Sequence, residues 1–140
     1  MGNYLGKAGG YEAFVASRIS PHVTFNPLAR MLHVALGLQS EAGEFADIFK
    51  KGLTKATPFN ELDEVNMKEE LGDLLFYIQD AATYLDTSIE ELAAINEAKL
   101  TARYPKGFTK EATDFRNLEV ERSILEGSVP PGFGPPTEND

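Results

Sequence analysis

One stretch of the chain has a long helical pattern of apolar residues, and it limits the possible folds more than any other feature. Asn26 is a favoured residue type at helix N-caps, and Pro27 suits a first helical position. Two lysines followed by Gly52 are typical of a helix end. Between these signals the apolar residues recur every three or four positions, at Leu28, Met31, Leu32, Ala35, Leu38, Ala42, Phe45 and Phe49. The sequence therefore predicts one long amphipathic helix over roughly 27–51.

Three further segments show helical patterns, over roughly 11–19, 61–85 and 88–104. Ser20-Pro21 is expected to end the first of them and to open a loop that runs to Asn26. The last segment opens with an S-x-x-E capping box at Ser88. No strand pattern or internal repeat is found. The sequence predicts an all-α bundle of four or five helices.

The length and composition fit a single domain with a distinct C-terminal end. The chain has 140 residues, which is the size of one domain. After Leu118 the composition changes, and prolines and glycines cluster between Pro130 and Pro136. We expect one all-α catalytic domain over 1–118 and a tail over 119–140, which is either disordered or an arm laid on a neighbouring subunit.

The charge and the missing residue types exclude several classes of protein. Lys and Arg total 13 against 22 Asp and Glu, so the formal net charge is −9. A protein that coats nucleic acid or binds membranes through a basic patch needs the opposite sign. The chain has no cysteine, which excludes disulfides, zinc ribbons and thiolate catalysis. We expect a cytoplasmic protein that contacts neither nucleic acid nor a membrane.

Two pairs of acidic residues stand beside the apolar positions of the two longest predicted helices. Glu41 and Glu44 form one pair, Glu70 and Asp73 the other, and each pair is spaced i, i+3 on one helix face. If these helices pack antiparallel, the four carboxylates converge at one level of the bundle.

Converging carboxylates repel one another, so they need either raised pKa values or bound cations. An oxygen-only ligand set suits Mg²⁺ first and Mn²⁺ second. Acid pairs of this spacing are also common on solvated helix faces. Two pairs with nearby helix-interior glycines favour the metal site, because Gly37, Gly43 and Gly72 would let a helix or a ligand approach closely.

A third set of polar residues lies in the predicted helix over 88–104. Asn96, Lys99 and Arg103 are three and four residues apart and share one face. An amide, an ammonium and a guanidinium together suit a polyphosphate, whereas a solvated basic face at a helix C-terminus is the alternative. On the polyphosphate interpretation, removal of Lys99 or Arg103 should change stability little.

Taken in order, these motifs resemble those of the MazG-like all-α nucleoside triphosphate pyrophosphohydrolases. The resemblance covers about residues 28–108: E-x-x-E, a spacer of 25 residues, E-x-x-D, then N-x-x-K and the RYP at Arg103. It implies hydrolysis of a (d)NTP to a (d)NMP and diphosphate. It also implies two or more Mg²⁺ ions per site, held by the four acids, and a homodimer or a homotetramer built from dimers.

The resemblance also suggests roles for individual residues. Glu44, beside Glu41, is our choice of general base, and Lys51 would join Asn96, Lys99 and Arg103 in binding the phosphates. A slight lean to guanine nucleotides comes from the association of this family with phage nucleotide pools, which would also place the protein in a host cytoplasm. Candidates for contacts to the base are Phe14, Arg18, Ile19, His33 and Gln39.

Two alternatives remain open. One is a sibling enzyme of the same superfamily, either a dUTPase or a phosphoribosyl-ATP pyrophosphatase, because the acid motifs fix the chemistry better than the substrate. The other is a non-catalytic helical adaptor that is stabilised by a metal. The adaptor would leave the basic face around Lys99 without a ligand.

Overall fold

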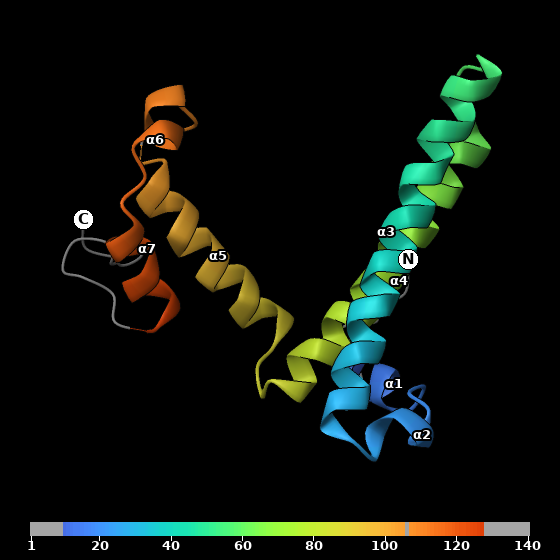
Figure 1. Cartoon of the computed structure of the whole chain (residues 1–140), viewed down its shortest axis with the longest axis horizontal. Coiled ribbons are helices and arrows are strands. Elements are labelled where there is room, and N and C mark those ends of the chain that lie inside the picture. The colour runs from blue at the N-terminus through green and yellow to red at the C-terminus, as the bar shows by residue number, and fades with distance from the viewer. Residues whose placement is uncertain (1–9, 106, 128–140) are drawn as a thin grey trace. The chain divides into compact units, whose positions relative to one another are not determined.

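The computed structural model describes residues 10–105 and 107–127, which contain seven helices and, apart from one isolated bridge between Pro105 and Gly107, no strand pairing. The predicted all-α class is confirmed. The chain divides into two compact units, residues 1–87 and 88–140, which are described separately (Figure 1). None of the described helices is both long enough and apolar enough to cross a membrane.

The first unit is a long helical hairpin with two short helices at its open end (Figure 1). Helix α3 (Pro27–Lys55) runs alongside α4 (Glu61–Tyr84). The short helices α1 (Gly10–Ala16) and α2 (Pro21–Thr24) pack against α4 and α3, respectively. The buried apolar side chains of this unit are Val15, Val34, Ile48 and Ala82.

The hairpin is locked near its open end by a buried ion pair. Arg30 of α3 donates hydrogen bonds from Nε (2.9 Å) and Nη2 (2.5 Å) to one oxygen of Asp80 on α4. The Asp80 side chain is fully buried and that of Arg30 is 20% exposed. Arg30 also lies over the ring of Tyr84. This contact fixes the register of the two long helices.

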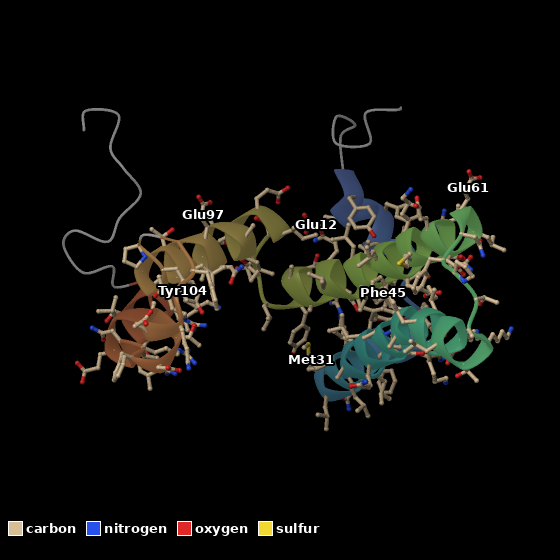
Figure 2. The ribbon with its side chains drawn as sticks, turned by 90° about the horizontal axis from the view of Figure 1, so that it is seen from above. Glu12, Met31, Phe45, Glu61, Glu97 and Tyr104 are labelled. Atoms are coloured by element: carbon tan, nitrogen blue, oxygen red, sulfur yellow. The ribbon has the colours of Figure 1, made fainter. Side chains whose placement is uncertain are left out.

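Both helix starts of the hairpin use asparagine caps. Asn26 accepts hydrogen bonds from the N–H groups of Leu28 and Ala29, so its predicted cap is confirmed. Asn60 caps α4 in a full capping box, since its side chain accepts from the Asp63 N–H while Asp63 accepts from the Asn60 N–H. Figure 2 shows Glu61 at this start of α4.

The predicted stop of α3 at Gly52 is wrong. The helix continues to Lys55 and ends at Ala56, which adopts a left-handed conformation (φ 50°). Gly52 lies inside the last turns of the helix, and its carbonyl accepts a hydrogen bond from the Thr57 N–H, where the chain turns back. A Cβ at this position would lie 3.6 Å from the ring of Phe59, which is ordinary contact, so the turn does not require a glycine here.

The segment expected to be a loop before Asn26 contains α2, and α1 ends at Ala16, earlier than expected. Ser20 caps α2 by accepting from the His22 N–H, and Pro21 occupies its first turn. Pro21, which the sequence suggests as the end of a helix, instead begins α2. Its missing N–H group costs nothing there, because the first N–H groups of a helix have no partner within the helix.

The second unit packs α5 (Ile89–Arg103) against α7 (Leu118–Leu125), with α6 (Lys110–Asp114) between them in sequence. Ser88 caps α5 as predicted, accepting from the Glu91 N–H at 3.0 Å. Figure 2 shows Tyr104 directly after α5, among the side chains of this unit, and Glu97 on an outward-facing side of α5.

The predicted boundary of the tail at residue 119 is wrong, since it falls inside α7. The side chain of Asn117 accepts from the Val120 N–H, and the buried residues Glu121 and Ile124 hold the helix in the fold. Composition averages over 119–140 hid this short amphipathic helix. Residues 128–140, where the prolines cluster, lie outside the described residues.

Candidate metal and phosphate site

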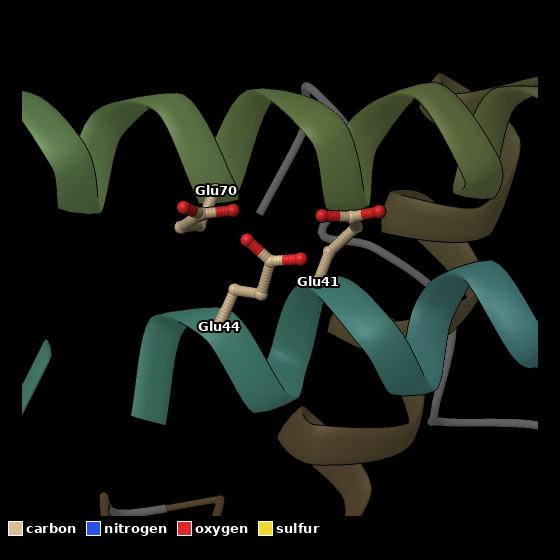
Figure 3. A group of neighbouring side chains, drawn as sticks. All are labelled: Glu41, Glu44 and Glu70. Carbon is tan, nitrogen blue, oxygen red and sulfur yellow. The ribbon is translucent and has the colours of Figure 1, made fainter. Parts of the chain in front are cut away.

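Three of the predicted acids meet between the two long helices. Glu41 and Glu44 of α3 and Glu70 of α4 each bring one carboxylate oxygen within 4.8 Å of the others (Figure 3). The i, i+3 spacing turns Glu41 and Glu44 to one side of α3, and the packing of α4 along α3 brings Glu70 opposite them. We call these three residues the acid group.

The fourth acid, Asp73, lies nearby but is not one of the three whose oxygens converge. It is close enough for its charge to raise the pKa of Glu41 and of Glu70. Since it follows Glu70 by three residues on α4, it lies about one turn further along the hairpin.

The electrostatics of the acid group favour a cation. Partial burial raises the pKa of Glu41 and Glu70, and the charge of Glu44 raises both further. Within residues 10–105 and 107–127, no ion pair to a basic side chain joins any of the three acids. Oxygen ligands without nitrogen or sulfur suit a hard divalent ion such as Mg²⁺. The residues present therefore fit a divalent metal.

An open cavity of about 480 Å³ adjoins the acid group. Its volume is within the range of about 300–1,000 Å³ that is usual for small-ligand sites. Two members of the acid group contribute to its wall, and the full lining consists of Ser40, Gly43, Glu44, Asp47, Ile48, Lys51, Asn66, Glu69 and Glu70. The carboxylates that could bind a metal ion therefore lie beside a cavity large enough for a small molecule.

Lys51 is the basic residue among those that line this cavity. Its ammonium pairs with Asp47 at 2.8 Å, and Lys50 pairs with the same carboxylate. Hydrogen bonds from the two lysines lower the pKa of Asp47 to about 2. The pKa of Lys51 is raised, chiefly by Asp47, with smaller contributions from Glu44 and Glu70. Lys51 therefore carries a persistent positive charge at the edge of the acid group.

The three glycines near the acids behave differently. A Cβ on Gly37 would lie 2.2 Å from the ring of Tyr77, so this glycine permits a close approach of α4. Gly43 and Gly72 have no atom within 4 Å of such a Cβ. The expected close approach is thus found at Gly37 with a helix, while Gly43 faces the open cavity.

Two tyrosines near the acids were missed by sequence reasoning. Partial burial raises the pKa of Tyr77, and Glu41 and Asp73 raise it further. Tyr11 of α1 also has a raised pKa, from burial and then from Asp73. The only sequence signal was the placement of Tyr77 one turn after Asp73. For Tyr11, the packing of α1 on α4 had to be known.

The candidates for contacts to the base are joined in pairs only. The Arg18 guanidinium lies 5.2 Å from the ring centroid of Phe14, and Phe14 stacks on Tyr11. The ring of His33 lies 5.5 Å from that of Tyr77, and its Nδ1 is buried without a hydrogen-bond partner among the described residues. Ile19 is half-buried, Gln39 is exposed, and no contact described here links either to these pairs.

The basic candidates belong to the second unit. Asn96 is exposed and Lys99 is half-buried on α5. Arg103 has a partner that the sequence did not predict, because it donates hydrogen bonds from Nε (2.9 Å) and Nη2 (2.5 Å) to Glu121 of α7. The expectation that Arg103 contributes little to stability therefore needs correction: its guanidinium helps to fasten α7 to α5.

The helical fold and the acid group define a class of all-α proteins with a carboxylate site for a divalent cation. Comparison with known proteins identifies the family. The MazG nucleotide pyrophosphohydrolase domain matches residues 30–108, which include all four acids as well as Asn96, Lys99 and Arg103. The chain belongs to this family, as its motifs predicted, and it is a hydrolase.

The chain is also similar to a phage protein. The "Gene 37 protein" of Mycobacterium phage L5 is 32% identical over 85 residues, which span 60% of this chain and 75% of the phage protein. No solved structure matches the chain. Enzymes of the MazG family are generally dependent on a divalent metal, which agrees with the acid group.

Proposed function

We propose that the protein is a Mg²⁺-dependent nucleoside triphosphate pyrophosphohydrolase that converts a (d)NTP and water to a (d)NMP and diphosphate. One observation carries the proposal: three carboxylates without ion-pair partners in the described structure converge within 4.8 Å, in a chain of the nucleotide pyrophosphohydrolase family. Such a group is costly unless a cation joins it.

Glu41, Glu44 and Glu70 would hold the metal, and Asp73, one turn from Glu70, would complete a site for two or more ions. When bound, such ions supply positive charge to phosphate oxygens and lower the pKa of water. Mn²⁺ offers the same chemistry and is expected to substitute.

Glu44 is the best placed of the acids to act as the general base. It is the exposed member of the acid group, and it lines the cavity. In the proposed reaction it takes a proton from the water that attacks the α-phosphorus. A new bond forms between the water oxygen and phosphorus, the bond to the bridging oxygen breaks, and diphosphate leaves. Glu41, three residues before Glu44 on the same helix face, is the second catalytic candidate.

Lys51 is proposed to neutralise the leaving diphosphate, because its ammonium group lines the cavity beside the acid group. Asn96, Lys99 and Arg103 are assigned to the phosphates on the strength of their family motif. Arg103 can do this only with the N–H groups that its hydrogen bonds to Glu121 leave free.

A preference for guanine nucleotides is part of the proposal, and two aromatic side chains of α1 support a site for the base. Tyr11 and Phe14 offer stacked rings on α1, and Tyr11 lies close enough to Asp73 for that charge to raise its pKa. Aromatic rings near the acid group suit a planar base. His33, Arg18, Ile19 and Gln39 stay candidates for polar or apolar contacts to it.

An oligomer is proposed from the apolar side chains that the hairpin leaves uncovered. Leu32 is 55% exposed and Leu36 is 62% exposed on α3, and Leu71 is 53% exposed on α4. Apolar stripes of this extent on two packed helices need a partner, and a second copy supplies a matching stripe. We therefore propose a homodimer or a tetramer built from dimers, acting on nucleotide pools in a phage-infected host cytoplasm.

The decisive experiment is a panel of nucleotides assayed with Mg²⁺ and with Mn²⁺, with the products identified. Release of diphosphate and a monophosphate from dGTP or another (d)NTP supports the proposal. Activity confined to dUTP or to phosphoribosyl-ATP would indicate a sibling enzyme. Metal-dependent melting without turnover of any nucleotide would favour the non-catalytic adaptor.

A further inference from the structure

The second unit contains two guanidinium groups that hold one carboxylate. Arg103, the last residue of α5, donates to both oxygens of Glu121, at 2.9 Å and 2.5 Å. Arg116, just before α7, donates to the same two oxygens, at 3.2 Å and 2.6 Å. We call Arg103, Arg116 and Glu121 the arginine triad.

The triad is buried at its centre and open at one side. The side chain of Glu121 is 7% exposed and that of Arg103 is 17% exposed, whereas that of Arg116 is 42% exposed. Hydrogen bonds from the two guanidiniums lower the pKa of Glu121 to about 2, so its charge persists at neutral pH. A ligand would therefore reach the triad from the side of Arg116.

The charges of the triad do not cancel. Two positive charges meet one negative charge, which leaves a net charge of +1. A pair of Arg103 with Glu121 alone would be neutral and would attract no anion. Glu121 neutralises the charge of Arg103, and Arg116 adds a second positive charge. The carboxylate of Glu121 meanwhile holds both guanidinium groups in place.

The geometry also leaves hydrogen-bond donors for a ligand. Both arginines use Nε and Nη2 for Glu121, so the Nη1 group of each lies outside these four hydrogen bonds. Arg103 also contacts the side chain of Tyr104, whereas Arg116 is the more exposed of the two arginines. Guanidinium groups that are already held in place lose little conformational freedom when an anion binds. Two such donors suit the terminal oxygens of a phosphate.

We propose that the arginine triad is a preorganised site for a terminal phosphate group of a polyphosphate, with Arg116 as a second phosphate-binding arginine beside Arg103. This inference rests on the proposed function for the identity of its ligand as a nucleoside triphosphate. Arg116 and Glu121 lie beyond residues 30–108, so the family match does not assign them. The competing interpretation is a purely structural clamp between α5 and α7.

The test is the affinity of the full-length protein for inorganic tripolyphosphate, measured by titration calorimetry without divalent ions and at fixed ionic strength. Arg116→Gln removes the second positive charge, and Arg116→Lys keeps it. Arg122→Gln is the matched control, because Arg122 is 73% exposed on α7 and, among the described residues, forms its ion pair with Glu126. Should Arg116→Gln fail to fold, Arg116→Met, which keeps much of the aliphatic stem, takes its place.

We expect Arg116→Gln to bind tripolyphosphate at least about tenfold more weakly than Arg122→Gln, as the loss of a charge-assisted contact implies. Arg116→Lys should have an affinity between those of Arg116→Gln and the control, because it keeps the charge but loses the planar fork that is held on Glu121. Equal affinity of Arg116→Gln and the control, or no binding by the parent protein, would overturn the proposal.

Because this titration needs no turnover, its outcome is independent of the proposed activity. If the parent hydrolyses no nucleotide but the triad binds tripolyphosphate as expected, the proposed function fails and the anion site stands. If turnover is found, Arg116→Gln should raise the KM for a nucleoside triphosphate and leave kcat near that of the control.

Discussion

The acid group and the arginine triad treat charge in opposite ways. In the first unit, Glu41, Glu44 and Glu70 bring like charges together without ion-pair partners among the described residues, and the pKa of Glu41 and Glu70 rises. In the second unit, two arginines surround Glu121, and its pKa falls to about 2.

The contrast shows what each cluster contributes. Opposite charges in contact stabilise the chain that carries them, so the arginine triad fastens α7 to α5 even without a ligand. Like charges in contact destabilise the chain until a cation arrives, so the acid group favours binding over stability. A cluster of acids without ion-pair partners therefore indicates a binding site more strongly than an acid in an ion pair does. Substitutions in the first kind should affect activity, and substitutions in the second kind should affect stability.

The largest expected effect is on activity, from neutralising the acids. Glu41→Gln, Glu44→Gln, Glu70→Gln and Asp73→Asn should each lower turnover on the order of 100-fold or more, since even the groups that support metal ligands matter by 10–100-fold. Melting in metal-free buffer should be unchanged or slightly higher, because one repelling charge is gone. A variant with near-normal turnover would remove its residue from the site.

The next largest effect is on stability, at an acid that does have a partner. Asp80→Ala should lower the free energy of unfolding by about 3–5 kcal/mol, because it leaves Arg30 without its buried partner. Glu64→Ala is the control, since Glu64 is exposed on the same helix and should matter by less than about 1 kcal/mol. Urea denaturation of both variants checks this. Similar losses would show that the buried pair is not special.

Smaller effects on stability are expected at two glycines of α3, of which one packs against a side chain of α4 and the other lies next to open space. Gly37→Ala should destabilise the protein by about 1–3 kcal/mol, because the new Cβ meets the ring of Tyr77. Gly43→Ala should stabilise it by up to about 1 kcal/mol, since its Cβ meets nothing and alanine favours a helix. Thermal melts of the two variants give the comparison. Stabilisation by Gly37→Ala would contradict the observed close approach.

The smallest effects are in the pH dependence, where the two clusters should differ in sign. The raised pKa of Glu70 means that its protonated form favours folding, so stability falls as pH rises from the ordinary glutamate value of about 4.3 through the raised pKa. The pKa of Glu121, lowered to about 2, contributes stability above the ordinary value, and this is lost as pH falls toward 2.

Melting temperatures across pH 2–7 without metal should show both slopes. Glu70→Gln should reduce the loss on the alkaline side, where the raised pKa of Glu41 still contributes. Glu121→Gln should reduce the loss on the acid side, where the lowered pKa of Asp47 still contributes. Saturating Mg²⁺ should also remove the first slope and leave the second in place. If Mg²⁺ changes neither slope, the acid group does not hold the ion.

Local patterns made much of the fold and the acid group predictable. The apolar stripe of α3, the caps at Asn26 and Ser88, and the i, i+3 spacing of the acids are all set by helix geometry. The family resemblance rested on the same residues, and the match over 30–108 confirms it.

What escaped prediction depends on contacts between distant segments. Arg103 looked free because its partner Glu121 lies 18 residues away, in a segment whose composition suggested a tail. Tyr11 reaches the neighbourhood of Asp73 only because α1 packs on α4. Gly52 suggested a helix stop, but α3 continues to Lys55 and ends at Ala56, next to the turn that leads into α4. Such choices come from tertiary packing, which residue spacing does not encode.

The central claim is that the acid group directs water to the α-phosphorus of a nucleoside triphosphate with the help of a divalent metal. The most direct test is hydrolysis of the preferred nucleotide in ¹⁸O-labelled water, with products analysed by mass spectrometry. We expect the label in the nucleoside monophosphate and unlabelled diphosphate, with Mg²⁺ present and not with a chelator. Label in the diphosphate, release of orthophosphate with a nucleoside diphosphate, or an undiminished rate with the chelator would contradict the account.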